Sequence, residues 1–344
     1  MKRNLEKNSA LYSDIKQMIE DARSAVAQTV NAGLTMLYWN IGKRINDEIL
    51  KNKRAGYGKQ IVATLSRQLE NEYGKGFSAK NIRRMIQFYE VFPDFEIVAS
   101  LMRQLSWTHF ILFIPIKNDI EREFYAQMCR IEKWSVRDLR KKIDSMLFER
   151  TAISKKPEEL AKLELKDLRD NDNLSPDLVF RNPYVLDFLD LKDTFQEKDL
   201  ERAILNEIEK FILELGKGFT FVERQKRIII DGEDFYLDLL FFHRKLKRLV
   251  ALDLKIGKFK AEYKGKMELY LRWLEKHETE EGEEQPIGLI LCAQGNSEQI
   301  ELLQLDKTNI RVAEYMTELL PKKLLQEKLR LFYKRSKRMI EDRE

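Results

Sequence analysis

Two consecutive hydrophobic segments constrain the fold of this chain more than any other feature. The first runs from Asp234 to His243 and the second from Leu249 to Ile256. Both are short and rich in branched and aromatic side chains, which is typical of buried β-strands. The brief connection between them, 244–248, predicts that the two strands are hairpin neighbours in one sheet.

Each of these strands has at least one charged residue inside its apolar run. Asp238 lies in the first, and Asp253 and Lys255 lie in the second. Because side chains alternate along a strand, Asp253 and Lys255 must share one face, and the hairpin can bring Asp238 beside them. Buried charges need a partner, and a divalent cation supplies one. The alternative is an edge strand with solvated charges, which the apolar flanks disfavour.

The oxygen atoms of this segment suit a hard cation. Mg²⁺ binds carboxylate and carbonyl oxygens, so Asp238, Asp253 and the backbone carbonyl of Leu254 are predicted to hold it, with Mn²⁺ as the alternative ion. Such an ion lowers the pKa of a bound water and offsets charge on a phosphate. Lys255 is expected to orient or deprotonate that water or to neutralise the phosphate; the sequence leaves these roles open.

A third acid is expected from the preceding helix. Periodic apolar residues predict one helix over about Lys198–Leu215. Glu201 and Glu207 both border its apolar stripe, so either can face the site. A solvated surface glutamate is the alternative for each.

The order of elements predicts two domains. Residues 11–150 have helical periodicity throughout, whereas a helix, strands and further helices alternate from about Asn182 onward. We therefore expect an all-helical domain at 1–150, a linker at 151–180, and an α+β (α/β) domain with a mixed central sheet at 181–344. The strands expected in the second domain are Phe219–Arg224, Arg227–Ile230, Phe235–His243, Leu249–Ile256, Ile287–Cys292 and Ile310–Tyr315, with a closing helix at Lys322–Arg343.

Positive charge indicates a polyanionic partner. The net charge of +5 is concentrated in residues 1–150. There, two helices flank Gly74–Ser78 in a helix–turn–helix-like pattern, and the second carries basic residues near its start, where such motifs contact nucleic acid. An ordinary surface helix is the alternative. Further residues expected to contact a phosphate backbone surround the predicted metal site. The predicted nucleic-acid contacts are Lys80, Arg83, Arg84, Arg224, Gln225, Lys258 and Lys260.

No apolar run approaches the roughly 20 residues that span a bilayer, and Met1–Ala10 is too polar for a signal peptide. We expect a cytoplasmic protein without a membrane partner. Cys129 and Cys292 are expected to be free thiols.

Several motifs resemble the YhcG-type family of PD-(D/E)XK nucleases. In the C-terminal half they are the residues 211–219, 224–225, 236–244, 249–259, 265–270 and 286–292, and in the N-terminal half 38–42, 54–58, 105–109 and 134–137. The resemblance covers nearly the whole chain. It implies a restriction-endonuclease-like domain preceded by a helical, winged-helix-like DNA-binding domain.

The resemblance also assigns roles to individual residues. It implies metal ligation by Asp238 and Asp253 and a catalytic role for Lys255. Glu207 stands before Gly218-Phe219 at the distance found for a helix glutamate in archaeal Holliday-junction resolvases, which favours it over Glu201. Two positions depart from the family pattern, because Asp253 replaces the usual Glu and Lys266 replaces a frequent Gln.

The leading hypothesis is a divalent-metal-dependent endodeoxyribonuclease that hydrolyses DNA phosphodiester bonds, with DNA as partner and a homodimer as a compatible assembly. One alternative is a DNA-binding protein whose dormant nuclease fold acts in recognition or assembly. Another is a helical interaction module joined to an unrelated domain, which leaves the shared face of Asp238, Asp253 and Lys255 unexplained.

Overall fold

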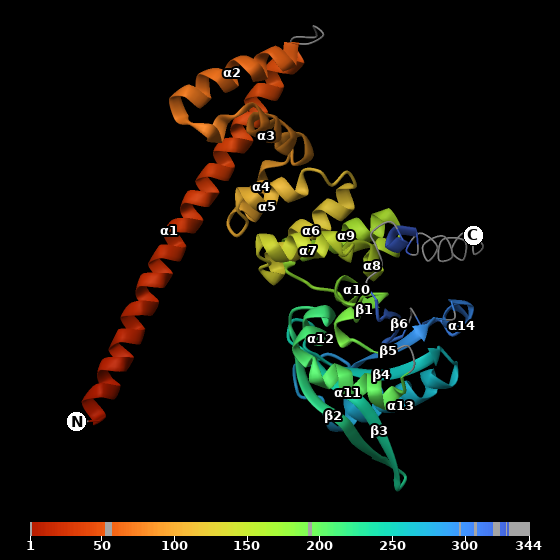
Figure 1. Cartoon of the computed structure of the whole chain (residues 1–344). Helices are drawn as coiled ribbons and strands as arrows, with labels where there is room; N and C mark the ends of the chain where they lie inside the picture. The colour runs from red at the N-terminus through yellow and green to blue at the C-terminus, as the bar shows by residue number, and fades with distance from the viewer. Residues whose placement is uncertain are drawn as a thin grey trace. The chain divides into compact units, whose positions relative to one another are not determined.

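The computed structural model describes residues 2–51, 57–191, 195–295, 297–305, 308–318, 324–327 and 329. The chain divides into two compact units, residues 1–141 and 142–344, and each has its own hydrophobic core (Figure 1). Among the described residues, none of the helices combines the length and hydrophobicity needed to cross a bilayer.

The described part of the first unit is entirely helical, as predicted. The helices α1, α2 and α3 pack around Ile45, Val62 and Ile82. Gly42 permits the close crossing of α1 and α3, because a Cβ there would overlap the carbonyl oxygen of Met85. The elements are α1 Lys2–Lys51, α2 Tyr57–Tyr73, the 3-10 helix η1 Lys75–Phe77, α3 Ala79–Val91, α4 Phe95–Met102, α5 Trp107–Phe113, α6 Asp119–Glu132 and α7 Val136–Asp144, which runs into the second unit.

The second unit contains a mixed sheet in the order β1-β6-β5-β4-β3-β2, which confirms the predicted α+β class. Strands β2, β3 and β4 are antiparallel neighbours, and β4, β5, β6 and β1 are parallel. The elements are α8 Leu147–Arg150, η2 Ala152–Lys155, α9 Glu158–Asn171, α10 Pro176–Val179, β1 Tyr184–Val185, η3 Asp187–Leu189, α11 Glu197–Asn206, α12 Ile208–Leu215, β2 Phe219–Ile230, β3 Glu233–His243, β4 Arg248–Lys258, α13 Glu262–His277, β5 Ile287–Gln294, α14 Ser297–Leu302 and β6 Ile310–Met316.

The helices that follow and precede the antiparallel strands cover the sheet. On α13, Met267, Tyr270 and Leu274 are buried in the main core of the unit. On α12, Phe211 packs against Phe241 of β3 with ring centroids 6.1 Å apart. The strands at the centre of the sheet are therefore buried, as their near-continuous apolar sequences indicate.

Four details differ from the sequence-based expectations. The helix expected over Lys198–Leu215 is two helices, because Glu207 leaves the helical conformation with φ −113°. The two strands expected between Phe219 and Ile230 form one strand, β2, interrupted locally by a left-handed residue, Gln225 (φ 46°). The segment expected as a linker, 151–180, with at most a short helix near Pro157–Leu163, contains the longer α9, whose residues Leu165 and Leu168 are buried. Most of the helix expected at 322–343 lies outside the described residues.

Candidate active site

The backbone of Leu254 joins the three residues that define the predicted site. Its N–H donates to Oδ2 of Asp238 at 2.8 Å, and its carbonyl oxygen accepts from Nζ of Lys255 at 3.0 Å. Nζ of Lys255 also lies 2.9 Å from Oδ2 of Asp253. The structure thus brings Asp238, Asp253 and Lys255 together, as the strand alternation predicts.

The hairpin geometry explains how Asp238 reaches the second strand. The described backbone pairing of β3 with β4 runs from His243↔Arg248 to Leu239↔Leu252. One residue further along β3, the carboxylate of Asp238 takes a backbone N–H of β4 as its partner. A carboxylate in this position replaces a ladder hydrogen bond, so the donor stays satisfied where the two strands separate.

Burial and like charge dominate the electrostatics of Asp238. Burial, and next the negative charge of Asp253, raise the pKa of Asp238 to about 6, against the opposing effects of Leu254 N–H, Lys255 and Gln225. Burial lowers the pKa of Lys255, but the attraction and hydrogen bond of Asp253 outweigh it, so that this pKa is raised. Lys255 is therefore an ammonium ion in this arrangement.

Two oxygens already converge on a positive charge. The ammonium of Lys255 contacts Asp253 Oδ2 and Leu254 O, two of the predicted metal ligands. Asp253 is only 3% exposed, and its Oδ1 has no hydrogen-bond partner among the described residues. The nearest further cation is Nζ of Lys266, at 3.9 Å from that oxygen. A buried acceptor without a donor is suited to bind a cation.

The donor set suits a hard divalent ion. Within the described residues, no three or more His, Cys, Asp or Glu side chains form a group that could hold a metal. The protein would therefore supply the carboxylates of Asp238 and Asp253 with the Leu254 carbonyl, leaving the other positions for water and substrate oxygens. Mg²⁺ usually keeps several such positions open.

The structure connects Glu201, rather than Glu207, to this group. Nε2 of Gln225 donates to Glu201 Oε2 at 2.8 Å and to Asp238 Oδ1 at 3.2 Å. Glu207 instead lies at the break between α11 and α12, where it pairs with Lys210 at 2.7 Å. The preference for Glu207 is thus not supported by these contacts, since Glu207 stands where α11 ends and its described ion pair is with Lys210.

Glu197 is a neighbour of the site that the sequence did not indicate. Its Oε2 lies 3.8 Å from Nζ of Lys255, and it stands one turn before Glu201 on α11. The i, i+4 spacing of these two glutamates was the available signal. On the other side, Nζ of Lys255 lies 5.4 Å from the ring centre of Tyr263, which belongs to α13.

The predicted nucleic-acid residues lie on both units. In the second unit, three of these residues are exposed: Arg224 on β2, Lys258 at the end of β4 and Lys260 just after β4. Gln225 is half-buried beside Asp238. In the first unit, Lys80 and Arg83 are exposed on α3, and the half-buried Arg84 donates to Asn81 at 3.4 Å. The buried side of α3 is formed by Ile82, Met85, Ile86 and Phe88.

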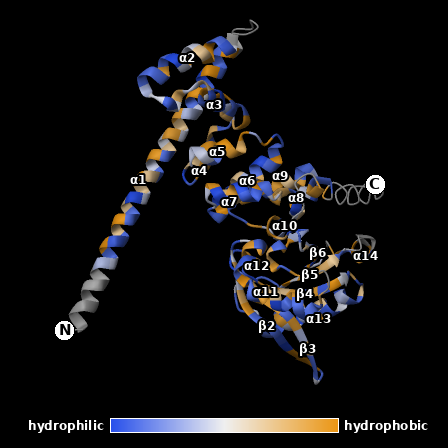
Figure 2. Cartoon of the chain, viewed as in Figure 1, coloured by the Kyte–Doolittle hydropathy of each residue, from blue (hydrophilic) through white to orange (hydrophobic). Residues whose placement is uncertain are grey.

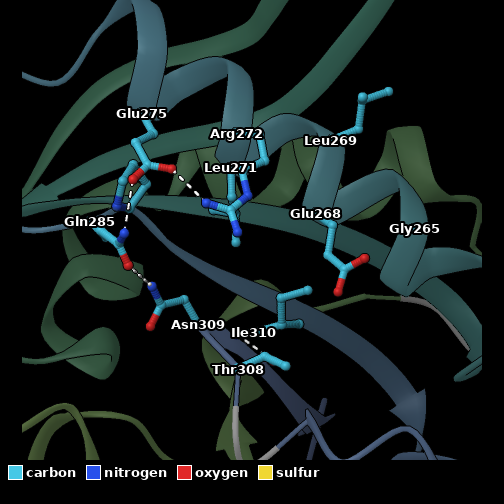
Figure 3. Close-up of a pocket in the computed structure, with 11 residues that line it drawn as sticks. Gly265, Glu268, Leu269, Leu271, Arg272, Glu275, Gln285, Thr308, Asn309 and Ile310 are labelled. Atoms are coloured by element: carbon cyan, nitrogen blue, oxygen red, sulfur yellow. Dashed lines mark hydrogen bonds and ion pairs between the residues drawn. The ribbon is translucent and has the colours of Figure 1, made fainter.

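A separate pocket of about 730 Å³ lies between α13 and the start of β5 and β6 (Figure 3). Its polar residues pair with one another: Glu275 accepts from Arg272 at 3.0 Å and from Gln285 at 2.9 Å, and Asn309 donates to Gln285 at 3.1 Å. No predicted site residue lines it. The pocket therefore has no part in the chemistry proposed for Asp238, Asp253 and Lys255.

Comparison with known proteins identifies the family. Residues 14–150 match the family model "DUF1016 N-terminal domain", and residues 177–330 match "YhcG PDDEXK nuclease domain". Over 350 aligned residues the chain is 35% identical to the Escherichia coli (strain K12) protein named "Putative nuclease YhcG", which covers 93% of this chain and 92% of that protein. The chain belongs to the YhcG family. The resemblance seen in the sequence motifs is thus confirmed, and the candidate site lies inside the nuclease domain of this YhcG-family chain.

Two solved structures show only a weak similarity to the YhcG-family chain. One is described as a crystal structure of a repair endonuclease from Pyrococcus abyssi, with TM-score 0.25 and 20% identity over 38% of this chain and 50% of that one. The other is the "EndoMS-dsDNA2 complex", with TM-score 0.28 and 17% identity over 38% of this chain and 49% of that one. TM-scores this low support no conclusion about the site.

Proposed function

We propose that this YhcG-family chain is a divalent-metal-dependent endodeoxyribonuclease that hydrolyses DNA phosphodiester bonds. The observation that supports the proposal is the ammonium of Lys255 held between Asp253 Oδ2 and Leu254 O, beside the buried carboxylate of Asp238. The buried carboxylates of Asp238 and Asp253, with Asp253 Oδ1 left without a hydrogen bond, would be stabilised by a bound cation.

Asp238, Asp253 and the carbonyl of Leu254 are the proposed ligands, with Mg²⁺ as the ion and Mn²⁺ as a substitute. When bound, such an ion lowers the pKa of a coordinated water and offsets the charge that grows on the phosphate. The side chain of Lys255 keeps its proton while it contacts Asp253. It is therefore suited to neutralise the phosphate of the substrate rather than to remove a proton from water.

Gln225 and Glu201 are proposed as positioning residues. Gln225 bridges Glu201 and Asp238 through a single amide nitrogen. This amide holds the Asp238 carboxylate in the orientation that also accepts the Leu254 N–H. Glu201 is thereby a better candidate than Glu207 for the acid contributed by the helix.

DNA is the proposed substrate because exposed basic residues occur on both units. In the nuclease unit, Arg224 and Lys258 are available to contact phosphates, and in the helical unit Lys80 and Arg83 are exposed at the start of α3. Contacts of this kind position a nucleic acid without selecting a sequence.

Cleavage assays on a panel of substrates test this function. Purified protein is incubated with branched, modified, single-stranded and duplex DNA, in Mg²⁺, in Mn²⁺ and in EDTA. We expect metal-dependent cleavage of at least one substrate, and its loss in Asp238→Asn and Lys255→Ala. Asp234→Asn is the matched control, because Asp234 lies on the same strand in an exposed pair with Arg227. Unchanged cleavage by Lys255→Ala, or cleavage in EDTA, would reject the assigned site.

Salt dependence tests the basic surface separately. We expect log Kd for DNA to rise linearly with log salt concentration, and Lys80→Ala and Arg83→Ala each to reduce the slope by about one phosphate contact. A DNA affinity that does not change with salt would contradict the proposed phosphate contacts.

A further inference from the structure

The long helix α1 exposes large hydrophobic side chains along much of its length. Between residues 12 and 37 these side chains are 41% to 71% exposed, an unusual density for a soluble surface. In Figure 2 the hydrophobic colour recurs along the part of α1 that extends beyond α2, α3 and α4. We call these eight residues the α1 stripe: Tyr12, Ile15, Met18, Ile19, Val26, Val30, Leu34 and Leu37.

Helical periodicity places the α1 stripe on one face. Its members follow one another mainly at intervals of three or four residues, and at 100° per residue all except Met18 lie within one broad sector. The opposite sector holds Thr35 and Trp39, which are buried in the first unit, with the Trp39 indole donating to Phe92 O at 2.8 Å. The core of the first unit thus uses one side of α1, and the stripe faces away from it.

The composition of this helix limits what can cover the stripe. No Asp, Glu, Lys or Arg occurs from Ser24 to Gly42, in a chain in which 35% of residues are charged. A DNA backbone or an anionic lipid surface would require Lys or Arg at the contact. Lys16 and Arg23 lie at the edge of the stripe in its N-terminal half, so this argument applies to the segment from Ser24 onward, where the partner must present an apolar face.

We propose that the α1 stripe binds the same stripe of a second copy of this chain, with the two helices antiparallel. A twofold pair requires a surface that is complementary to itself. If two antiparallel helices are centred between residues 24 and 25, Tyr12 meets Leu37 of the other copy, Ile15 meets Leu34, and Ile19 meets Val30. Large apolar residues then face large apolar residues at these three positions in each half of the contact, whereas Val26 meets Arg23 of the other copy near its centre.

The charges agree with this orientation. The charged residues Asp14, Lys16, Glu20, Asp21 and Arg23 all precede the uncharged segment. In the antiparallel register the residues directly opposite them are uncharged, and only the two Arg23 side chains, three residues apart across the centre, approach each other, whereas a parallel pair aligned in register places every identical charge side by side. Opposed helix dipoles also favour the antiparallel pair.

The size of the stripe is sufficient for a stable dimer. The seven side chains that share one sector, each at least 41% exposed, offer on the order of 650 Å² per copy, within the range of about 600–1,000 Å² that each partner contributes to a standard interface. No single-chain contact of this extent covers them in the part of the chain that the structure describes.

Two paired variants of the full-length protein test the dimer. Ile19→Glu combined with Val30→Glu puts two like charges opposite each other across the stripe, and Ser24→Glu combined with Gln28→Glu puts the same charge on the opposite, exposed face. By light scattering after size exclusion, we expect the wild type and the opposite-face variant at twice 41.0 kDa. The stripe variant is expected at 41.0 kDa, or as a dimer whose dissociation constant is at least about tenfold higher. Glu favours helix more than Val does, so circular dichroism should show unchanged helix content.

Single cysteines test the orientation. Under mild oxidation, a mixture of Ile19→Cys and Val30→Cys proteins should form a disulfide between the two variants, and Ile19→Cys alone should not. The native thiols Cys129 and Cys292 are buried and do not compete. A monomeric wild type, a stripe variant that dimerises as well as the wild type, or cross-linking of Ile19→Cys to itself would each overturn the proposal. A monomer would point instead to coverage of the stripe by the second unit of the same chain.

Discussion

Replacing Asp238 by Asn should stabilise the protein in the absence of metal while removing its response to metal. The carboxylate of Asp238 is buried next to the negatively charged Asp253, and its pKa is raised from 3.8 to about 6. An acid whose pKa rises on folding contributes stability that is complete below about pH 4 and is lost as the pH rises through about 6. At pH 8 the charged carboxylate therefore works against the fold.

The size of the effect follows from the shift and the hydrogen bonds. A shift from 3.8 to about 6 corresponds to about 3 kcal/mol at pH 8. Asn can still accept the Leu254 N–H, but its amide N–H₂ faces the Nε2 donor of Gln225, and losing that hydrogen bond costs about 1 kcal/mol. The net gain of about 2 kcal/mol should raise the Tm of the second unit by roughly 4–8 °C.

Thermal melts in EDTA at pH 8 and at pH 4 measure this effect. The gain of Asp238→Asn should appear at pH 8 and disappear at pH 4, where the wild-type side chain is already protonated. Asp234→Asn, which breaks an exposed pair with Arg227, should change the Tm little at either pH. Saturating Mg²⁺ should stabilise the wild type, by about 2.7 kcal/mol at one hundred times its Kd, but not Asp238→Asn. A variant that melts below the wild type at pH 8 in EDTA, or a gain that persists at pH 4, would refute the argument.

Three further substitutions test the packing and the charges. Lys255→Ala leaves the buried Asp253 without its partner, so the free energy of unfolding in EDTA should fall by about 3–5 kcal/mol. Part of this stability should return in Mg²⁺; equal melting temperatures of the variant in EDTA and in Mg²⁺ would argue against a cation at this position. Arg150→Ala removes the 2.6 Å pair of a 1% exposed guanidinium with Glu214 and should lower the free energy of unfolding in urea by about 3–5 kcal/mol; a loss below 1 kcal/mol would contradict a structural role. Gly42→Ala should force α1 and α3 apart, which costs about 1–3 kcal/mol and lowers the Tm of the helical unit. Gly33→Ala places its methyl group in open space and should not lower the Tm. Similar Tm values for the two variants would reject the close crossing of α1 and α3.

Local periodicity was sufficient to predict the central strands and the placement of the charged residues within them. Alternation with period two depends only on neighbouring residues, so the shared face of Asp253 and Lys255 could be deduced before any contact was known. The pairing with Asp238 also followed, because a short connection leaves two adjacent strands little choice but a hairpin. The helical character of the first unit was predicted for the same reason, since a 3.6-residue period is a local property.

The break at Glu207 had no comparable signal. Neither Gly nor Pro marks that position, and apolar residues keep helical spacing across it. The chain leaves the helix there and resumes it in α12, which places Phe211 on Phe241. Packing on the sheet therefore decided which glutamate faces the strands.

The sequence by itself determined that the two strands pair as a hairpin and that their charged residues share one face. It also determined the apolar surroundings that make those buried charges unfavourable. Only the tertiary structure decided that Gln225 links Glu201 to Asp238, and that Leu254 holds Asp238 and Lys255 through its two backbone groups. The physical reason is the range of the interactions. Side-chain alternation is set between adjacent residues, whereas these hydrogen bonds join a helix and three strands whose separation is fixed by the packing of the whole sheet.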